Sequence, residues 1–333
     1  MISVAVLGAG RIGQIHARTL AAHPGARLHG IADVDADAAA RLARFCNTSP
    51  VSLDDAFAAD AVVICTPTPT HAGLIERAAS AGRAVFCEKP IDLDAGRVRT
   101  CLGAVARAGI PLMVGFNRRF DPSFRALRDR LRAGQIGRLE LLTITSRDPA
   151  PPPAQYVAVS GGLFRDMMIH DLDMARFLLN EEPVEVHAVA SVMVDPAIGE
   201  AGDFDTAAVI LRTASGAICQ ISNSRRATYG YDQRIEAHGA RGMLRVGNMT
   251  ATTLECGSES GFVTGAALPF FLERYANAYR AEMDAFLSAV ASGRTPEPGG
   301  ADGLASLVLA DAATESARSG KPVRIAAPGA PGG

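Results

Sequence analysis

Residues 2–13 read Ile-Ser-Val-Ala-Val-Leu-Gly-Ala-Gly-Arg-Ile-Gly, and this stretch decides the fold of the first part of the chain. Its apolar run, 2–7, is typical of a parallel strand that is covered on both faces. The pattern Gly8-x-Gly10-x-x-Gly13 follows and leads into a helical pattern. A glycine turn between a strand and a helix predicts a phosphate-binding site at the N-terminus of that helix.

The alternation of strand and helix continues to residue 119. Helical patterns separate the apolar runs, and this rhythm predicts an α/β fold with a doubly wound parallel sheet of the Rossmann type over residues 1–119. Further strands are expected at 27–32, 61–66, 84–87 and 111–116, and helices at 11–22, 35–45, 71–81 and 93–108.

A second domain is predicted over residues 120–325. Strand patterns follow one another here with few helices between them, which favours an α+β domain with a mostly antiparallel, open sheet. The tail, 326–333, contains only Ala, Pro and Gly and is expected to be disordered. Strands are expected at 139–145, 184–194, 205–212, 217–224, 232–238, 243–247 and 322–325, and helices at 122–133, 166–179, 270–291 and 301–318.

The composition argues against several classes of protein. A net charge of −2 disfavours nucleic acid or an anionic membrane surface as the main partner. No apolar run approaches the roughly 20 residues that span a bilayer, and the N-terminus lacks the basic region of a signal peptide. We therefore expect a cytoplasmic protein, with its cysteines as small core residues and not as disulfides or metal ligands. These are Cys46, Cys65, Cys87, Cys101, Cys219 and Cys256.

Asp33 ends the second predicted strand, twenty residues after Gly13. A carboxylate at this position of a Rossmann domain accepts hydrogen bonds from the adenosine ribose of a bound dinucleotide. Residues 34–37 offer no Arg or Lys to hold a 2′-phosphate, so we expect NAD and not NADP. The alternative is that Asp33 only caps the helix that follows it.

The other cofactor contacts are expected where strands end on the same sheet edge, because ligands bind there in open α/β folds. One member of this set, His71, could instead begin the next helix as a surface residue, and we prefer that position for its side chain. The full predicted cofactor set is Gly8, Gly10, Arg11, Ile12, Gly13, Asp33, Val34, Thr66, Pro67, Thr70, His71, Glu88 and Lys89.

The segment 161–173 carries the candidate for proton transfer. Asp166 and His170 stand four residues apart, which places both on one face of the predicted helix. An imidazole beside a carboxylate is suited to move a proton near neutral pH. A zinc site at His170, Asp171 and Asp173 is an alternative, but no second histidine or cysteine stands nearby at metal spacing, so we expect no metal.

Lys89 lies between Glu88 and Pro90, at the end of the fourth predicted strand. A lysine there can donate a hydrogen bond to a substrate hydroxyl and stabilise negative charge that grows on it. The alternative is an ordinary surface lysine. Its position at the strand end favours the functional interpretation, and hydride transfer combined with proton transfer would make an alcohol dehydrogenase.

Three motifs together resemble a known family. Gly-x-Gly-Arg-Ile-Gly-x-x-His at 8–16, Glu-Lys-Pro at 88–90 and Asp-x-x-x-His at 166–170 resemble the glucose-fructose oxidoreductase / inositol dehydrogenase / rhizopine catabolism family. Segments 115–121, 167–173 and 224–232 are most similar to its inositol 2-dehydrogenase branch. The resemblance implies NAD-dependent oxidation of a cyclic polyol, myo-inositol to scyllo-inosose, by a homotetramer.

The same resemblance implies roles for individual residues. The family's catalytic set is matched by Lys89, Asp166 and His170, with His170 as general base and Asp166 orienting it. A tyrosine matched by Tyr231 would reach a neighbouring subunit's site. The residues implied to contact substrate are Lys89, Asn117, Arg118, Asp148, Asp166, His170, Asp173, Tyr231 and Tyr279.

The chain departs from some relatives at Asn117 and in Ser146-Arg147-Asp148-Pro149. The resemblance implies that these positions belong to the pocket that sorts stereoisomers, so a dehydrogenase for scyllo-inositol or an aldohexose is the first alternative. A non-catalytic NAD-binding sensor is the second. The intact Lys, Asp and His argue against the sensor, because a protein without turnover would be free to lose them.

Overall fold

The computed structural model describes residues 1–325, and the predicted disordered tail, 326–333, lies outside the described residues. The chain divides into two compact units: Met1–Phe120 with Asn277–Leu307, and Asp121–Ala276 with the chain from Val308 onward. The domain boundary predicted from the sequence, between residues 119 and 120, lies near the first of these changes. The return of residues 277–307 to the first unit was not predicted.

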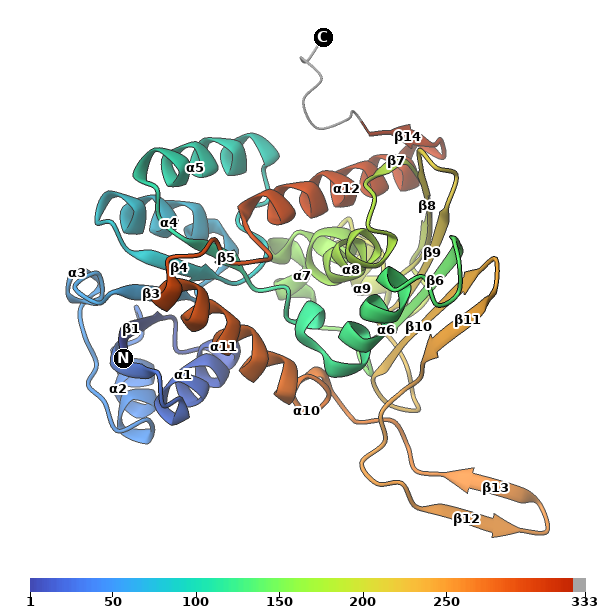
Figure 1. The fold of residues 1–333 in the computed structure, drawn as a ribbon, viewed down its shortest axis with the longest axis horizontal. Coiled ribbons are helices and arrows are strands. Elements are labelled where there is room, and N and C mark those ends of the chain that lie inside the picture. Colours follow the sequence, from blue (N-terminus) through green and yellow to red (C-terminus); the bar gives the residue numbers. More distant parts are fainter. Residues whose placement is uncertain (326–333) are drawn as a thin grey trace. The chain divides into compact units, whose positions relative to one another are not determined.

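The first unit contains a five-stranded sheet in the order β2-β1-β3-β4-β5. Figure 1 labels four of its strands, β1, β3, β4 and β5. All of its neighbouring strands are parallel, which confirms the predicted doubly wound sheet. The strands are β1 (Ile2–Leu7), β2 (Ala26–Ala32), β3 (Ala61–Ile64), β4 (Ala84–Cys87) and β5 (Leu112–Val114).

The register of this sheet aligns the carboxyl ends of four strands. Leu7 pairs with Ala32 of β2 and with Ile64 of β3, and Ile64 pairs with Cys87 of β4. The residues that directly follow these strands therefore lie along one edge of the sheet: Gly8, Asp33, Cys65 and Glu88.

Helices of the first unit begin where the sequence supplies caps. Asp35 and Asp94 accept backbone N–H groups at the starts of α2 and α5, and Gly109 ends α5 in the left-handed region. The single turn α3 has no counterpart in the sequence analysis because it is too short to show a period. The elements are α1 (Arg11–Ala22), α2 (Ala36–Phe45), α3 (Leu53–Ala56), η1 (Thr68–Thr70), α4 (His71–Ser80), α5 (Ala95–Ala108), η2 (Asn117–Phe120) and α11 (Ala276–Ser292).

The second unit is built on a seven-stranded sheet in the order β11-β10-β6-β9-β8-β7-β14. Only β6 and β9 are parallel among its neighbouring pairs in the described chain, which confirms a mostly antiparallel sheet. The strands are β6 (Leu139–Arg147), β7 (Pro183–Ser191), β8 (Thr206–Thr213), β9 (Ile218–Ser224), β10 (Asp232–Gly239), β11 (Gly242–Val246) and β14 (Val323–Arg324).

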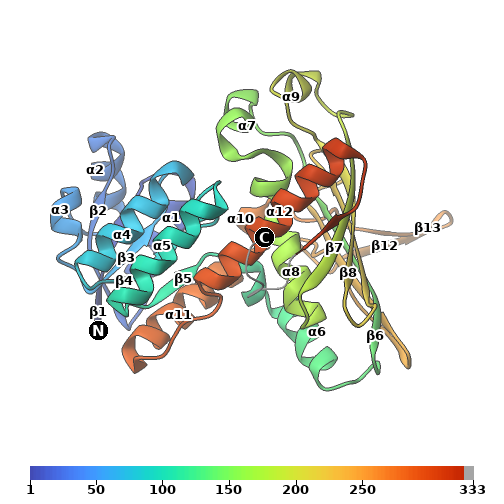
Figure 2. The same ribbon diagram turned by 90° about the horizontal axis from the view of Figure 1, so that it is seen from above.

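Helices cover one face of this sheet: α6 (Pro122–Arg132), α8 (Ile169–Leu179) and the C-terminal half of α12 (Gly300–Ser319) lie on the same side (Figure 2). Burial alternates along β8 and β10, as expected when only one face is covered. Apolar side chains are exposed on the opposite face, and these are Leu141, Val189, Ile210 and Ile218.

Two short helices of the second unit were not predicted, and these are α7 (Ala154–Ser160) and α9 (Pro196–Glu200). The helix predicted at 270–291 is divided at Tyr275 into the single turn α10 (Phe271–Arg274) and the longer α11. The hairpin of β12 (Glu255–Ser258) and β13 (Gly261–Thr264) is also new, and every residue of both strands is exposed. Cys256 lies on β12, so the prediction that all six cysteines are core residues is wrong for this one.

The helix predicted over 166–179 begins differently. Leu163–Met167 forms a π-helical turn, η3, and the α-helix α8 starts only at Ile169. The chain enters this turn through Gly161 and Gly162, both with positive φ, and a Cβ on Gly162 would lie 2.4 Å from the Asp203 carboxylate. The simple one-face placement of the predicted pair on a single α-helix is therefore wrong.

Candidate cofactor site and catalytic residues

The three glycines of the turn after β1 have three different surroundings. Gly8 has a φ of +103°, and a Cβ on it would lie 2.7 Å from the backbone of Cys65. A Cβ on Gly13 would lie 1.9 Å from the carbonyl oxygen of Gly8, so α1 packs directly on the turn. Gly10 has nothing within 4 Å of its Cβ position, and it begins α1 without a side-chain cap. An open helix N-terminus of this kind fits a phosphate group.

Asp33 is hydrogen-bonded to this turn. Its Oδ2 accepts a hydrogen bond from the backbone N–H of Ala9 at 2.5 Å, and its Oδ1 accepts one from Asp35 at 2.8 Å. The cap of α2 is Asp35, whose Oδ1 accepts from the N–H of Ala38 at 2.9 Å. Asp33 is therefore not the cap of the next helix, and its half-buried carboxylate stands beside the glycine turn, where a dinucleotide ribose fits.

The loop after β3 is ordered by its own hydroxyls and by a buried imidazole. Thr66 Oγ1 and Thr70 Oγ1 lie 2.6 Å apart. His71 is only 1% exposed, so the preferred surface position for its side chain is wrong. Its Nε2 lies 2.7 Å from the carbonyl oxygen of Thr66, and its Nδ1 lies 2.8 Å from that of Pro90. Burial lowers the pKa of His71, and the two carbonyl contacts oppose that shift.

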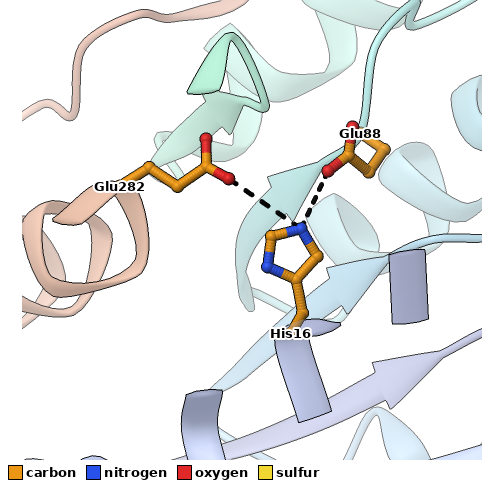
Figure 3. Close-up of side chains that lie close together, drawn as sticks. All are labelled: His16, Glu88 and Glu282. Carbon is orange, nitrogen blue, oxygen red and sulfur yellow. Dashed lines mark hydrogen bonds and ion pairs between the residues drawn. The ribbon is translucent and has the colours of Figure 1, made fainter. Parts of the chain in front are cut away.

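Glu88 belongs to a buried cluster that the sequence analysis did not predict. Nε2 of His16 donates to Oε1 of Glu88 at 2.8 Å and lies 4.0 Å from Oε1 of Glu282 (Figure 3). Burial, joined by the Glu88 carboxylate, raises the pKa of Glu282 well above its usual range. In the described chain these three side chains are close enough to share a metal ion, although none was predicted.

The predicted proton-transfer residues lie in the second unit. Asp166 is in the π-helical turn, and its Oδ1 accepts a hydrogen bond from the hydroxyl of Tyr156 at 3.1 Å. His170 is in the first turn of α8, and both side chains are half-buried. The neighbouring Asp171 is fully buried and accepts from Nδ2 of Asn223 at 2.9 Å. Tyr156 was missed because the run of prolines before it masks the helix on which it lies.

The predicted substrate residues are divided between the units. Asp173, in the second unit, is 1% exposed and lies 3.6 Å from Nη1 of Arg176. Tyr231 is 5% exposed and packs edge-on against Phe270 and Tyr275. Asp148 also lies in the second unit, whereas Lys89, Asn117, Arg118 and Tyr279 belong to the first.

The chain matches known proteins along most of its length. The family model described as "Oxidoreductase family, NAD-binding Rossmann fold" matches residues 2–116, and that described as "GFO/IDH/MocA C-terminal domain" matches residues 124–245. The chain is 53% identical over 324 residues to Inositol 2-dehydrogenase of Rhizobium meliloti (strain 1021), covering 96% of this chain and 98% of that protein.

Two further matches are similar in extent. Myo-inositol 2-dehydrogenase of Thermotoga maritima is 44% identical over 327 residues, covering 97% of this chain and 98% of that protein. The crystal structure of scyllo-inositol dehydrogenase from Lactobacillus casei, with bound NAD(H) and scyllo-inositol, has a TM-score of 0.91 at 30% identity, covering 97% of this chain and 99% of that one. The chain thus belongs to the GFO/IDH/MocA family of oxidoreductases, and its first unit is the NAD-binding Rossmann fold of that family.

Proposed function

We propose that this chain is an inositol 2-dehydrogenase that oxidises myo-inositol to scyllo-inosose with NAD. The observation that carries the proposal is its 53% identity, over 96% of the chain, to the Rhizobium meliloti Inositol 2-dehydrogenase. The open N-terminus of α1 and the carboxylate of Asp33 support the choice of cofactor, because they fit the pyrophosphate and the ribose of NAD.

In the proposed reaction His170 accepts the proton of the reacting hydroxyl as general base. Asp166 orients His170 and stabilises the imidazolium that forms, and the hydroxyl of Tyr156 in turn fixes Asp166. Lys89 donates a hydrogen bond to the reacting oxygen and stabilises the negative charge on it. NAD, when bound, supplies the acceptor for the hydride that leaves the carbinol carbon.

The remaining polyol hydroxyls require donors and acceptors on the protein. We propose that Arg118 and Asn117 contribute from the first unit and Asp173 from the second, because each is polar and at least 95% buried. Asp148, Tyr231 and Tyr279 complete the proposed set. The cofactor set proposed from the sequence is retained, with the backbone of the glycine turn at its centre.

A second substrate is favoured by one specific similarity. The solved scyllo-inositol dehydrogenase from Lactobacillus casei holds NAD(H) and scyllo-inositol and is 30% identical to this chain. The two inositols differ only in the configuration at one carbon, so the pocket residues decide between them. An aldohexose dehydrogenase and a non-catalytic NAD sensor remain as weaker candidates.

We further propose a homotetramer in the cytoplasm. Val189 is 64% exposed on the uncovered face of the second unit's sheet, and Phe262 is 81% exposed on the β12–β13 hairpin. A two-stranded hairpin is marginally stable alone in water, so packing against a second copy of the chain would stabilise it. No helix within residues 1–325 is both long and apolar enough to cross a membrane.

The test is a panel of substrates with each nicotinamide cofactor. Purified protein is mixed with NAD or NADP and with myo-inositol, scyllo-inositol or an aldohexose, and formation of reduced cofactor is followed by its near-ultraviolet absorbance. The proposal expects the highest kcat/KM with NAD and myo-inositol. Preference for another polyol would overturn the substrate alone, and no turnover of any polyol would overturn the enzyme.

A further inference from the structure

The short segment that carries Lys89 has a buried histidine on each side of it. Glu88, just before the lysine, accepts a hydrogen bond from Nε2 of His16 at 2.8 Å. The carbonyl oxygen of Pro90, just after it, lies 2.8 Å from Nδ1 of His71. The two histidines come from different helices, α1 and α4, and are 0% and 1% exposed.

The ring of His16 is fixed in place by more than its hydrogen bond. It packs edge-on against Phe86, with ring centroids 4.9 Å apart, and against Tyr279 at 5.7 Å. Its helix begins in the glycine turn at Arg11, five residues before the ring, so the ring connects the proposed phosphate site to the end of β4. The carboxylate of Glu88 is confined on another side, because a Cβ on Gly115 would lie 3.0 Å from it.

The ring of His71 connects two loops. Its Nε2 lies 2.7 Å from the carbonyl oxygen of Thr66, and its Nδ1 meets that of Pro90. Carbonyl oxygens only accept, so a neutral ring donates to one of them and a doubly protonated ring donates to both. In either state the buried ring spans the loop after β3 and the residue that follows the lysine.

We propose that His16 and His71 act together as positioning residues for Lys89, holding the segment 88–90 between them as a histidine clamp. This proposal rests on the dehydrogenase function proposed above. A lysine that must meet a reacting oxygen needs a fixed backbone, because small displacements of a catalytic group cost large factors in rate. The direct contact of 2.8 Å between His16 and Glu88 is a hydrogen-bond distance, so the imidazole can hold the carboxylate of Glu88 in place.

The clamp is tested with two removal variants, two conservative variants and a packing control. His16→Phe and His71→Leu remove the donors, whereas His16→Gln and His71→Asn each keep an amide N–H near the original nitrogen. Ile75→Val is the control, since Ile75 is fully buried on α4, one helical turn beyond His71. It removes one buried methyl group and leaves both histidines in place.

Two readouts are taken on the folded proteins. Hydrogen–deuterium exchange in the cofactor-free protein should be faster for the amides of residues 88–92 in both removal variants, and unchanged in Ile75→Val. The kcat for myo-inositol with NAD should fall by roughly tenfold or more with little change in KM, and the conservative variants should recover at least part of it.

The results of these experiments test the histidine clamp and the proposed dehydrogenase function separately. Wild-type exchange rates in both removal variants would overturn the clamp, as would a loss of kcat no larger than that of Ile75→Val. A stoichiometric metal ion retained through chelator dialysis and lost in His16→Gln would overturn the role of His16. If the wild type oxidises no polyol, the proposed function fails, and the exchange measurement still decides the clamp.

Discussion

The carboxylate of Asp33 accepts the backbone N–H of Ala9 at 2.5 Å, so the end of β2 is hydrogen-bonded to the middle of the glycine turn. This contact places a negative charge beside the proposed adenosine ribose. A 2′-phosphate would be repelled there. The exposed side chain of the next residue, Val34, lies where a positive charge could reverse the preference.

The double variant Asp33→Ser with Val34→Arg is therefore expected to shift cofactor preference toward NADP. Loss of the carboxylate weakens the contacts to the ribose of NAD, and the arginine gains a charge-assisted hydrogen bond to the 2′-phosphate. The ratio of kcat/KM for NADP to that for NAD should rise by about tenfold or more. Asp35→Ala, which removes the side-chain cap of α2 and leaves Asp33 in place, serves as the control, and an equal shift in that variant would contradict the role of Asp33.

Substitution of alanine at two glycines should have opposite consequences. Gly10→Ala meets no protein atom within 4 Å, and the φ of Gly10, −69°, suits alanine, so the Tm should hardly change. The added methyl points into the proposed phosphate site, so the Kd for NAD should rise by about tenfold or more. Titration calorimetry with the cofactor and a thermal melt check the two parts.

Gly13→Ala should instead destabilise the fold. Its Cβ would stand 1.9 Å from the carbonyl oxygen of Gly8, so α1 must move away from the turn. Gly73→Ala, at an open position of α4, is the matched control and should stabilise by about 0.5–1 kcal/mol. A melt in which the Gly13 and Gly73 variants behave alike would refute the close packing.

Glu282 makes the stability of the protein depend on pH. Its pKa in the fold is raised by burial and by Glu88, so the folded chain keeps a proton that the unfolded chain loses above its ordinary range. Stability from this group is therefore complete at acid pH and is lost as pH rises toward the folded pKa, by up to about 1.4 kcal/mol per pH unit. The thiol of Cys65, which also faces Glu282, has a pKa raised by burial and stays neutral over that range.

Glu282→Gln removes this dependence. The free energy of unfolding of the variant, from urea titrations between acid and neutral pH, should gain on that of the wild type as pH rises. Glu259→Gln, at an exposed carboxyl in the turn between β12 and β13, should leave the pH slope unchanged. Parallel slopes for the wild type and Glu282→Gln would mean that Glu282 is already ionised in the fold.

The proposed oligomer depends on apolar side chains at the hairpin. Phe262→Ser with Val263→Ser removes two exposed apolar groups from β13, and the mass from sedimentation velocity should fall below that of the wild type. Leu53→Ser, also at an exposed apolar position but in the first unit, should leave the mass unchanged. A wild-type protein that sediments as a monomer would contradict the proposed oligomer.

The sequence predicts most of the strands and the cofactor edge because both depend on local patterns. Apolar runs, the glycine spacing and Asp33 are each read within a few residues. The burial of His71 was missed because it depends on the carbonyl oxygen of Pro90, nineteen positions along the chain. Glu282 carried no local signal, since a glutamate in a helical pattern is ordinary until α11 brings it to His16.

The prediction of where α8 starts was wrong for a similar reason. The π-helical turn around Asp166 follows two glycines with positive φ, and both carboxylate oxygens of Asp203 accept the N–H of Leu163, at 3.1 and 2.9 Å. That contact spans forty residues, and helical spacing alone cannot reveal it. The sequence predicts which residues form the proton-transfer pair, but it does not predict the backbone conformation around them.

His170 is proposed as the base of an NAD-dependent polyol oxidation, and this role carries the proposed mechanism. It is tested most directly by the initial rate of NAD reduction with myo-inositol, measured for the wild type and for His170→Ala at equal cofactor saturation. We expect turnover in the wild type and a loss of about 100-fold to 10,000-fold in kcat in the variant, with the Kd for NAD unchanged. A variant that keeps a near-normal kcat would contradict it.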